Sequence, residues 1–346
     1  TRDVGGGAER VFEDVRVCME QNGVVARCVV GYQLSNNSGC EIFPHLSSSK
    51  FWELLCWKLH GRLEKYEKQN GVVAWLRAQL RVAAQGIPGI QRLLGIEDFY
   101  YPGMRRFFDS LSPYPDVVHL HNLHGGYFDL RYLPKISQRA AVFITLHDEW
   151  LYTGHCAHSI DCDRWLRGCG HCPDLERYPA IQRDKTAYNW MRKRKIYQKS
   201  RLHLVTPSNW LAGRVQRSVL ADQECRVIHN GVDLSLFSPS PEKDDLRRKM
   251  QLSVYDFIVL YVAVGGKKNV YKDAETVQRV VENLSMECNQ RKICFLELGG
   301  DERAVFERGN LSVYQIPFST DRKYVADLFR CRSEEHTSEL QSPNTI

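Results

Sequence analysis

The sequence predicts an α/β protein of two domains, each built on a parallel, doubly wound sheet covered by helices. Three observations support this prediction: β-rich runs alternate with helix-length segments, a glycine triplet opens a helix near the start, and the alternation begins anew after residue 239. The length of 346 residues fits about two domains of roughly 150 residues each. We expect the second domain to be incomplete, because only three strands are visible in it.

The first domain is expected at residues 1–238. It opens with Gly5, Gly6 and Gly7, after which apolar residues follow at helical spacing until Gly23 ends the helix. Five β-rich runs come next, separated by helix-length segments, at residues 24–30, 116–121, 141–146, 202–206 and 225–229.

The second domain is expected at residues 239–331, after a linker made of Ser238, Pro239, Ser240 and Pro241. Its pattern predicts a helix and three strands, the helix at 274–288 and the strands at 257–264, 293–298 and 311–316. Residues 332–346 have neither helical nor strand periodicity, and 332–342 resemble the in-frame translation of a sequencing-library adapter. We expect them to be a non-native tail and the natural chain to be truncated at both ends.

Composition restricts the class of protein. Hydrophobic residues make up 43% and charged residues 25%, which excludes disordered and collagen-like chains, and the net charge of +6 is compatible with anionic partners without requiring them. No apolar run approaches the roughly 20 residues of a membrane-spanning helix. Of the twelve cysteines, eight are scattered singly, which favours a reducing cytoplasm. These eight are Cys18, Cys28, Cys40, Cys56, Cys225, Cys288, Cys294 and Cys331.

Two basic segments are candidates for contact with a membrane. Residues 50–95 predict helices with an apolar face formed by Trp52, Leu55 and Leu59, flanked by lysines and arginines, which is typical of helices that rest on a lipid surface or receive a lipid-linked acceptor. Residues 183–201 hold eight basic residues against Asp184 alone. The alternatives are helices packed on the domain and a solvated helix face.

Polar residues gather where two predicted strands end. His119, His121, Asn122 and His124 lie in or after one strand, and the segment 145–150, which contains His147, follows the next. In open α/β sheets ligands bind at the carboxyl ends of the strands. We therefore expect the functional site at this edge.

Four segments, in this order, resemble the retaining family-4 glycosyltransferases of the GT-B fold, in a branch that builds bacterial exopolysaccharides: VVHLHNLHGGYF, FITLHDEWLYTGHC, VTPSNWLAGRV and IHNGVDLSLFSP. The resemblance covers about residues 3–330 and implies two Rossmann-like domains that face a cleft. It implies a hexosyltransferase of cell-surface polysaccharide synthesis, which moves a sugar from a nucleotide-sugar donor to a glycan or lipid-linked acceptor with retention and without a catalytic metal. The family's acidic pair, seven residues apart, would lie beyond residue 331, so we expect this chain to be inactive.

The resemblance also implies roles for single residues. His147 occupies the position of the histidine that contacts the donor sugar, and a core or capping histidine is the alternative. Gly5, Gly6 and Gly7 suit the donor, since N–H groups at a helix N-terminus favour anions, although a tight turn explains such a triplet equally well. His121 and Asn122 are expected on the acceptor side.

Two lysines keep the spacing of the family's cations that neutralise the departing diphosphate. Lys267 and Lys272 are five positions apart, as the family's basic residue and lysine are. The family has arginine at the first position and glycine after the second, whereas this chain has Lys267 and Asp273. Lysine still supplies a point charge, without the two-pronged contact of arginine. A solvated loop charge is the alternative for both lysines.

A cysteine cluster is separate from this site. Cys156, Cys162, Cys169 and Cys172 lie in a loop rich in glycine and histidine, and the last two form a C-x2-C pair. A structural zinc ion, reduced thiols and disulfides are the three interpretations. The Asp161-Cys162-Asp163 run lies inside this cluster, so we do not count it as a catalytic metal motif.

Two other functions are open to the sequence. A metal-stabilised nucleic-acid-binding protein would need aromatic residues interleaved with basic ones and a repeated zinc motif, and neither is visible, so we expect no nucleic-acid partner. Another GT-B enzyme, such as a phosphorylase, would need a lysine for pyridoxal phosphate in the region beyond residue 331. We expect a cytoplasmic protein that lies in part against the inner face of the membrane.

Overall fold

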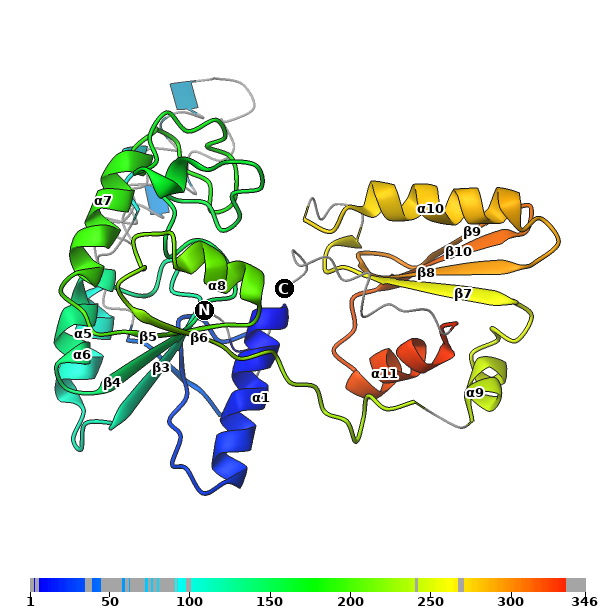
Figure 1. The fold of residues 1–346 in the computed structure, drawn as a ribbon, viewed down its shortest axis with the longest axis horizontal. Coiled ribbons are helices and arrows are strands. Elements are labelled where there is room, and N and C mark those ends of the chain that lie inside the picture. The colour runs from blue at the N-terminus through cyan, green and yellow to red at the C-terminus, as the bar shows by residue number, and fades with distance from the viewer. Residues whose placement is uncertain are drawn as a thin grey trace. The chain divides into compact units, whose positions relative to one another are not determined.

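The computed structural model describes residues 3, 6–34, 39–44, 93–97, 101–239, 242–266 and 271–333, together with a few scattered positions between 58 and 91. The contacts divide the chain into two compact units, residues 1–230 and residues 231–345. The division lies between Asn230 and Gly231, somewhat before the linker expected at 238–241. Each unit is an α/β structure whose main sheet is parallel, apart from one antiparallel edge strand in the second unit, so the expected class of two Rossmann-like units is confirmed (Figure 1).

The sheet of the first unit is parallel throughout and its strands follow in chain order. These strands are β3 (Val117–His121), β4 (Ala141–Thr145), β5 (His203–Thr206) and β6 (Glu224–Val227). Residues two apart share a face, so Val118 and Leu120 are buried on one face of β3, and His119 and His121 lie on the other. All four strands were predicted within one or two residues.

The described part of this unit contains seven helical segments, and the buried side chains of all of them except α1 form one core with the sheet. They are α1 (Gly7–Gln21), α5 (Pro102–Ser110), η2 (Leu130–Tyr132), α6 (Leu133–Ser137), η3 (Arg164–Leu166), α7 (Thr186–Tyr197) and α8 (Asn209–Val215). Local sequence explains several helix starts: Pro102 fixes the first turn of α5, and the Ser208 hydroxyl accepts from the N–H of Leu211 at the start of α8. No helix in the described part of the chain is long and apolar enough to cross a membrane.

The strand expected at residues 24–30 is much shorter than the pattern predicts. Only β1 (Val29–Val30) is a strand, and it pairs in parallel with β2 (Glu41–Ile42), a strand that the sequence did not indicate. Val25 is fully exposed and therefore gains nothing from strand formation here. Two of the eight cysteines that are scattered along the sequence, Cys28 and Cys40, are joined by a disulfide beside this strand pair, a pairing that the sequence did not indicate.

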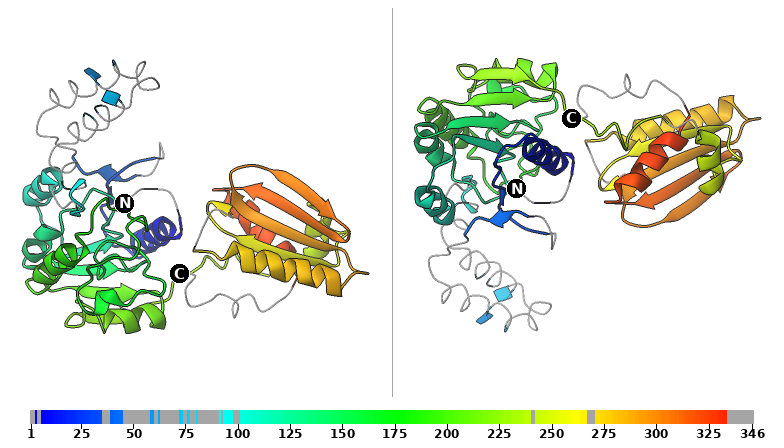
Figure 2. Two further views of the ribbon diagram at one scale, coloured as in Figure 1. Left: turned by 90° about the horizontal axis from the view of Figure 1, so that it is seen from above. Right: turned by 90° about the horizontal axis from the view of Figure 1, so that it is seen from below.

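The sheet of the second unit is covered on both faces. Its order is β7 (Phe257–Val262), β8 (Ile293–Gly300), β10 (Leu311–Pro317) and β9 (Ala304–Arg308), with β9 antiparallel to β10. Helices α9 (Lys243–Lys249) and α11 (Arg322–Cys331) pack on one face, and α10 (Ala274–Glu287) packs on the other, as the two views of Figure 2 show. Residues of β8 alternate between these two cores, which explains its continuous apolar run.

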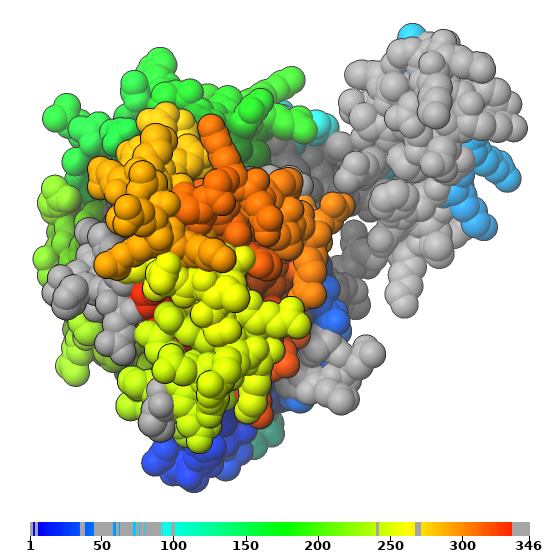
Figure 3. All heavy atoms as spheres, turned by 90° about the vertical axis from the view of Figure 1, so that its right-hand side faces the viewer, coloured from blue at the N-terminus to red at the C-terminus, as the bar shows by residue number. Residues whose placement is uncertain are grey.

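Strand β9 was not predicted, so the expected three strands become four. It is an edge strand whose side chains are almost all exposed, including Val305 and Phe306, and it ends in charged residues. Because such a strand has no buried face, its sequence lacks the alternation of apolar and polar residues by which a strand is predicted. A turn at Gly309, with φ of +62°, joins it to β10. Figure 3 looks onto this unit, whose segments are coloured from yellow to red.

The first residues of the segment expected to be a tail belong to the described structure. Ser333 is buried, its N–H donates to the carbonyl oxygen of Ile258, and its hydroxyl accepts from the Ile258 N–H. Arg332 follows α11 directly. Residues 334–346 and most of residues 50–95, including Trp52 and Leu55, lie outside the described residues.

Candidate functional site

Three histidines meet at the carboxyl ends of β3 and β4. His121 is the last residue of β3 and pairs in register with Thr145, the last residue of β4, and His147 follows two positions later. Nδ1 of His121 lies 2.9 Å from Nε2 of His147, and the two rings stack with centroids 5.3 Å apart. His119 lies beside His121, with ring centroids 4.4 Å apart, and its Nε2 contacts the Thr145 hydroxyl at 2.8 Å.

These imidazoles are neutral at neutral pH. Burial, together with the neighbouring histidines, lowers the pKa of His121 to about 2. Burial also lowers the pKa of His147 to about 4, although the charges of Asp148 and Glu9 oppose this shift, and burial lowers the pKa of His119. In a neutral pair one nitrogen donates and the other accepts, so the protonation of His121 Nδ1 fixes the tautomer of His147.

The start of α1 lies against this histidine group. The ring of Phe12 contacts the ring of His121 edge-on, with centroids 5.5 Å apart, and the carboxylate of Glu9 acts electrostatically on His147. Gly6 caps α1, and its N–H donates to the Glu9 carboxylate at 3.0 Å. The structure thus brings Gly6 into the neighbourhood of His147, and these are two of the residues that the resemblance assigns to the donor. Gly5 lies outside the described residues.

The loops after β3 and β4 are tied together behind the histidines. Asn122 has a φ of +41°, a left-handed conformation that asparagine tolerates and that turns the chain out of β3. The Tyr127 hydroxyl donates to the carbonyl oxygens of His121 and Asn122. His124 Nε2 lies 2.7 Å from the Asp148 carboxylate, which also accepts from the Trp150 N–H.

A buried carboxylate next in sequence anchors the segment after His147. Glu149 is 2% exposed and accepts hydrogen bonds from Tyr152 and His158, while the Arg214 guanidinium lies 2.5 Å away. Burial alone would raise its pKa, but the hydrogen bonds from His158, Tyr152 and the Ser159 N–H outweigh burial and lower the pKa to about 2. The guanidinium of Arg214 lies over the ring of Trp210. This network was not predicted from the sequence, although Glu149 lies inside the segment 145–150 that was expected at the site.

A second buried ion pair holds the same segment on α7. Lys193 is fully buried, and its ammonium donates to the carbonyl oxygens of Trp150 and Thr153 and to Glu97. Burial lowers the pKa of Lys193 and raises that of Glu97. One of the eight basic residues of 183–201 is therefore structural and does not belong to a solvated face.

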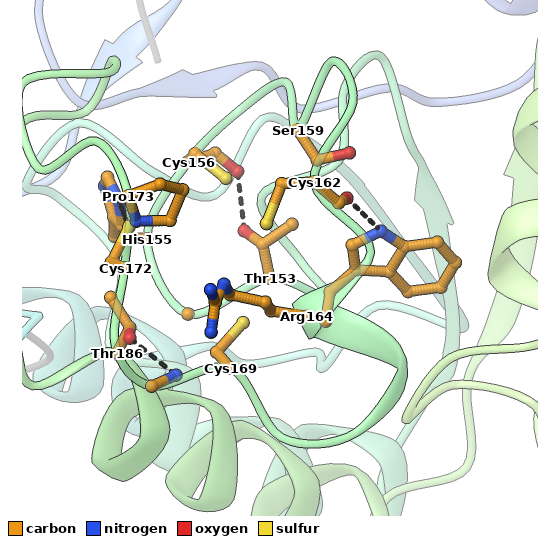
Figure 4. Close-up of a pocket in the computed structure, with 13 residues that line it drawn as sticks. Thr153, His155, Cys156, Ser159, Cys162, Arg164, Cys169, Cys172, Pro173 and Thr186 are labelled. Carbon is orange, nitrogen blue, oxygen red and sulfur yellow. Dashed lines mark hydrogen bonds between the residues drawn. The ribbon is translucent and has the colours of Figure 1, made fainter.

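The four clustered cysteines line one pocket, together with His155 and Arg164 (Figure 4). All four are free thiols, and burial raises the pKa of Cys156 to about 11 and that of Cys169 to about 12. In the described parts of the chain, no three His, Cys, Asp or Glu side chains converge closely enough to hold a metal ion as they stand.

In the second unit, Lys272 lies directly before α10. It is half-buried, burial lowers its pKa, and its carbonyl oxygen accepts from the Tyr261 hydroxyl. Asp273, which replaces the family's glycine, caps α10 with a φ of +43°, so the backbone here has the conformation that glycine adopts most easily. Lys267 lies outside the described residues.

The buried histidines predict a pH dependence of stability. The folded chain keeps His121 and His147 neutral below the ordinary pKa of 6.5, whereas the unfolded chain protonates them there. The free energy of unfolding should therefore fall as the pH drops below about 6.5. His121→Asn removes one such group, so between pH 6.5 and 5 the variant should lose about 2 kcal/mol less than the parent chain.

Chemical denaturation at several pH values measures this difference. His203→Asn, at a half-exposed histidine of β5, is the control for loss of a histidine. Equal pH dependence of the parent chain and His121→Asn would show that His121 is not held neutral by the fold.

Known proteins resemble this chain in the region that contains the histidine group. The model of the family described as Glycosyltransferase Family 4 matches residues 58–236, which is more than half of the chain. A protein of Escherichia coli (strain K12), whose name assigns it to colanic acid biosynthesis as the glycosyl transferase WcaC, is 29% identical over 131 residues. That match covers 35% of this chain and 32% of the relative, so the chain spans about a third of that protein's length.

Among solved structures, a sucrose-phosphate synthase from Thermosynechococcus elongatus is similar at 12% identity with a TM-score of 0.48, over 96% of this chain and 69% of that chain. The family match includes β3, β4 and the loops that carry His121 and His147. The chain belongs to glycosyltransferase family 4.

Proposed function

We propose that this protein is a retaining hexosyltransferase that moves a sugar from a nucleotide-sugar donor to a glycan or lipid-linked acceptor in cell-surface polysaccharide assembly. Family membership supports the reaction class. The observation that carries the proposal is the contact between His121 and His147 at the carboxyl edge of the sheet, beside the start of α1. Such an edge is where open α/β sheets bind ligands.

The glycines at the start of α1 are proposed to receive the donor. Gly6 has a φ of −83°, and a side chain on Gly7 would meet nothing within 4 Å, so neither backbone conformation nor internal crowding requires glycine at these positions. Glycines in such an open position allow a ligand to approach the backbone closely. The N–H groups of this first turn favour an anion, and a diphosphate would compete there with the Glu9 carboxylate.

His147 is proposed to contact the donor sugar beside the reacting carbon. Positive charge develops at that carbon in the transition state. A neutral imidazole can bind a sugar hydroxyl there without adding repulsion, and the lowered pKa of His147 keeps it neutral. His121 is then a positioning residue, because its contact with Nε2 orients the ring of His147. Asn122, which turns the chain beside it, is proposed to face the acceptor.

The cations of the second unit are proposed to bind the diphosphate as it departs. Lys272 precedes the N-terminus of α10, a helix of 14 residues whose positive end adds to the charge of the lysine. Lys267 would supply the second charge. Negative charge develops on the leaving group in the transition state, so fixed cations there lower the activation barrier. Contacts that are made equally in the ground state do not lower it. The proposal needs no catalytic metal.

The test of this function is His147→Ala in the full-length protein. Removal of one contact made in the transition state should lower kcat by roughly a hundred- to a thousand-fold while the circular dichroism spectrum stays unchanged. The matched control is His203→Ala. His203 belongs to the same sheet but lies at the amino end of β5, away from the carboxyl edge, so this variant should keep the parent rate. Sugar transfer at the parent rate by a folded His147→Ala enzyme would make His147 a structural histidine.

We further propose that the protein lies against the inner face of the membrane through α7, where a lipid-linked acceptor would be found. The exposed side of α7 combines basic residues, Arg194 and Lys195, with the apolar side chains of Tyr188 and Met191. Basic residues near an anionic surface contribute about 1 kcal/mol each. Lys193 cannot contribute to this binding, because it is buried.

Vesicle sedimentation tests the membrane contact. Replacing Arg194 and Lys195 with glutamine should weaken binding to phosphatidylglycerol vesicles roughly thirtyfold, at about 1 kcal/mol per residue. The exposed neighbours Arg248 and Lys249 of α9 form a matched pair, and their replacement with glutamine should have little effect. Equal losses from both double variants, or binding to pure phosphatidylcholine, would contradict a specific surface on α7.

A further inference from the structure

The pocket of the cysteine loop has the composition of a metal site, and it is separate from the histidine group. Cys156, Cys162, Cys169 and Cys172 come from four points along one loop and all line the same small cavity (Figure 4). None of them is disulfide-bonded. We propose that this pocket is a structural zinc site with these four thiolates as its ligands.

Four sulfur ligands favour zinc. Zn²⁺ prefers four-coordinate tetrahedral sites, and thiolate ligands select soft or borderline metals over Mg²⁺ and Ca²⁺. Binding replaces the four S–H bonds by Zn–S bonds and releases the protons to the buffer, with no change of oxidation state. The site has no open position for a substrate, so the metal would stabilise the loop and take no part in sugar transfer.

The backbone makes a tight turn beside the pocket. Gly168, Cys169, Gly170 and His171 have φ values of +116°, +57°, +86° and +47°, four left-handed residues in succession. For Cys169 and His171 this conformation is strained, and such residues persist only where their surroundings hold them. A metal bound by both Cys169 and Cys172 would hold this turn closed.

Neighbouring groups fix the backbone of each proposed ligand. The Thr153 hydroxyl donates to the carbonyl oxygen of Cys156, and the Trp165 indole N–H donates to that of Cys162. The N–H of Gly170, next to Cys169, donates to the Thr186 hydroxyl. The Cys172 N–H donates to the Asp184 carboxylate at 2.7 Å. Supporting contacts of this kind orient the ligands of metal sites.

Charge around the pocket is complementary to a four-thiolate zinc site, which carries two net negative charges. Arg164 lines the pocket, and the buried Lys193 is close enough to interact electrostatically with Cys156 and Cys169. His155 donates from Nδ1 to the Pro179 carbonyl oxygen, so the unprotonated Nε2 of the neutral ring faces the Cys172 thiol at 3.3 Å, and zinc binding would replace this contact. Because the thiols do not converge as they stand, the proposal requires them to rotate about χ1 into the cavity that they line.

The experiment measures zinc on the complete chain, expressed in a reducing cytoplasm and purified without chelators. Elemental analysis should give about one zinc per chain, and X-ray absorption should give sulfur neighbours at about 2.3 Å. Removal of the metal by a chelator should make four further cysteines reactive towards a thiol reagent. These readouts use the parent chain, so they do not depend on whether a variant folds.

Two double variants assign the ligands. Cys169→Ser with Cys172→Ser should lose the zinc, whereas Cys225→Ser with Cys288→Ser, at free half-buried cysteines outside the pocket, should keep it. The proposal is overturned by a parent chain with reduced thiols and no bound metal, by a disulfide between any two of the four cysteines, or by full zinc content in the first double variant. None of these outcomes depends on glycosyltransferase activity.

Discussion

The parallel pairing of β3 with β4 is the constraint on which the candidate site depends. Its register places His121 opposite Thr145, so that His147, two residues further, reaches the ring of His121. Side chains alternate along a strand, so a shift of one residue would send His119 and His121 into the apolar core and bring Val118 and Leu120 to the site. The apolar residues that fix the register therefore also fix the chemistry.

Two buried ion pairs hold the segment that the register positions. Glu149 with Arg214 ties the chain after His147 to α8. Lys193 of α7, which is paired with Glu97, holds the same segment by donating to the carbonyl oxygens of Trp150 and Thr153. Removal of one partner from such a pair leaves an uncompensated buried charge and typically costs about 3–5 kcal/mol. The cysteine loop begins within this segment, so its fold and the orientation of His147 share the same supports.

The sequence was sufficient for features that depend on local pattern. Strands β3 to β8 and β10 follow from apolar runs, and the histidine group follows from polar residues placed at strand ends. It was not sufficient where contacts join distant segments. The disulfide between Cys28 and Cys40, the packing of Phe12 on His121 and the burial of Lys193 all depend on tertiary packing that no local pattern records. The edge strand β9 was missed because it has no buried face.

The central claim, that the donor binds beside His147 and the start of α1, is tested most directly by nitrogen-15 NMR of the histidine rings during titration with UDP-glucose, UDP-galactose and GDP-mannose. The account predicts that one of these donors shifts the ring signals of His147 and His121, with His203 on the same sheet unaffected. A donor that binds the protein and leaves the signals of His147 and His121 unchanged would contradict it.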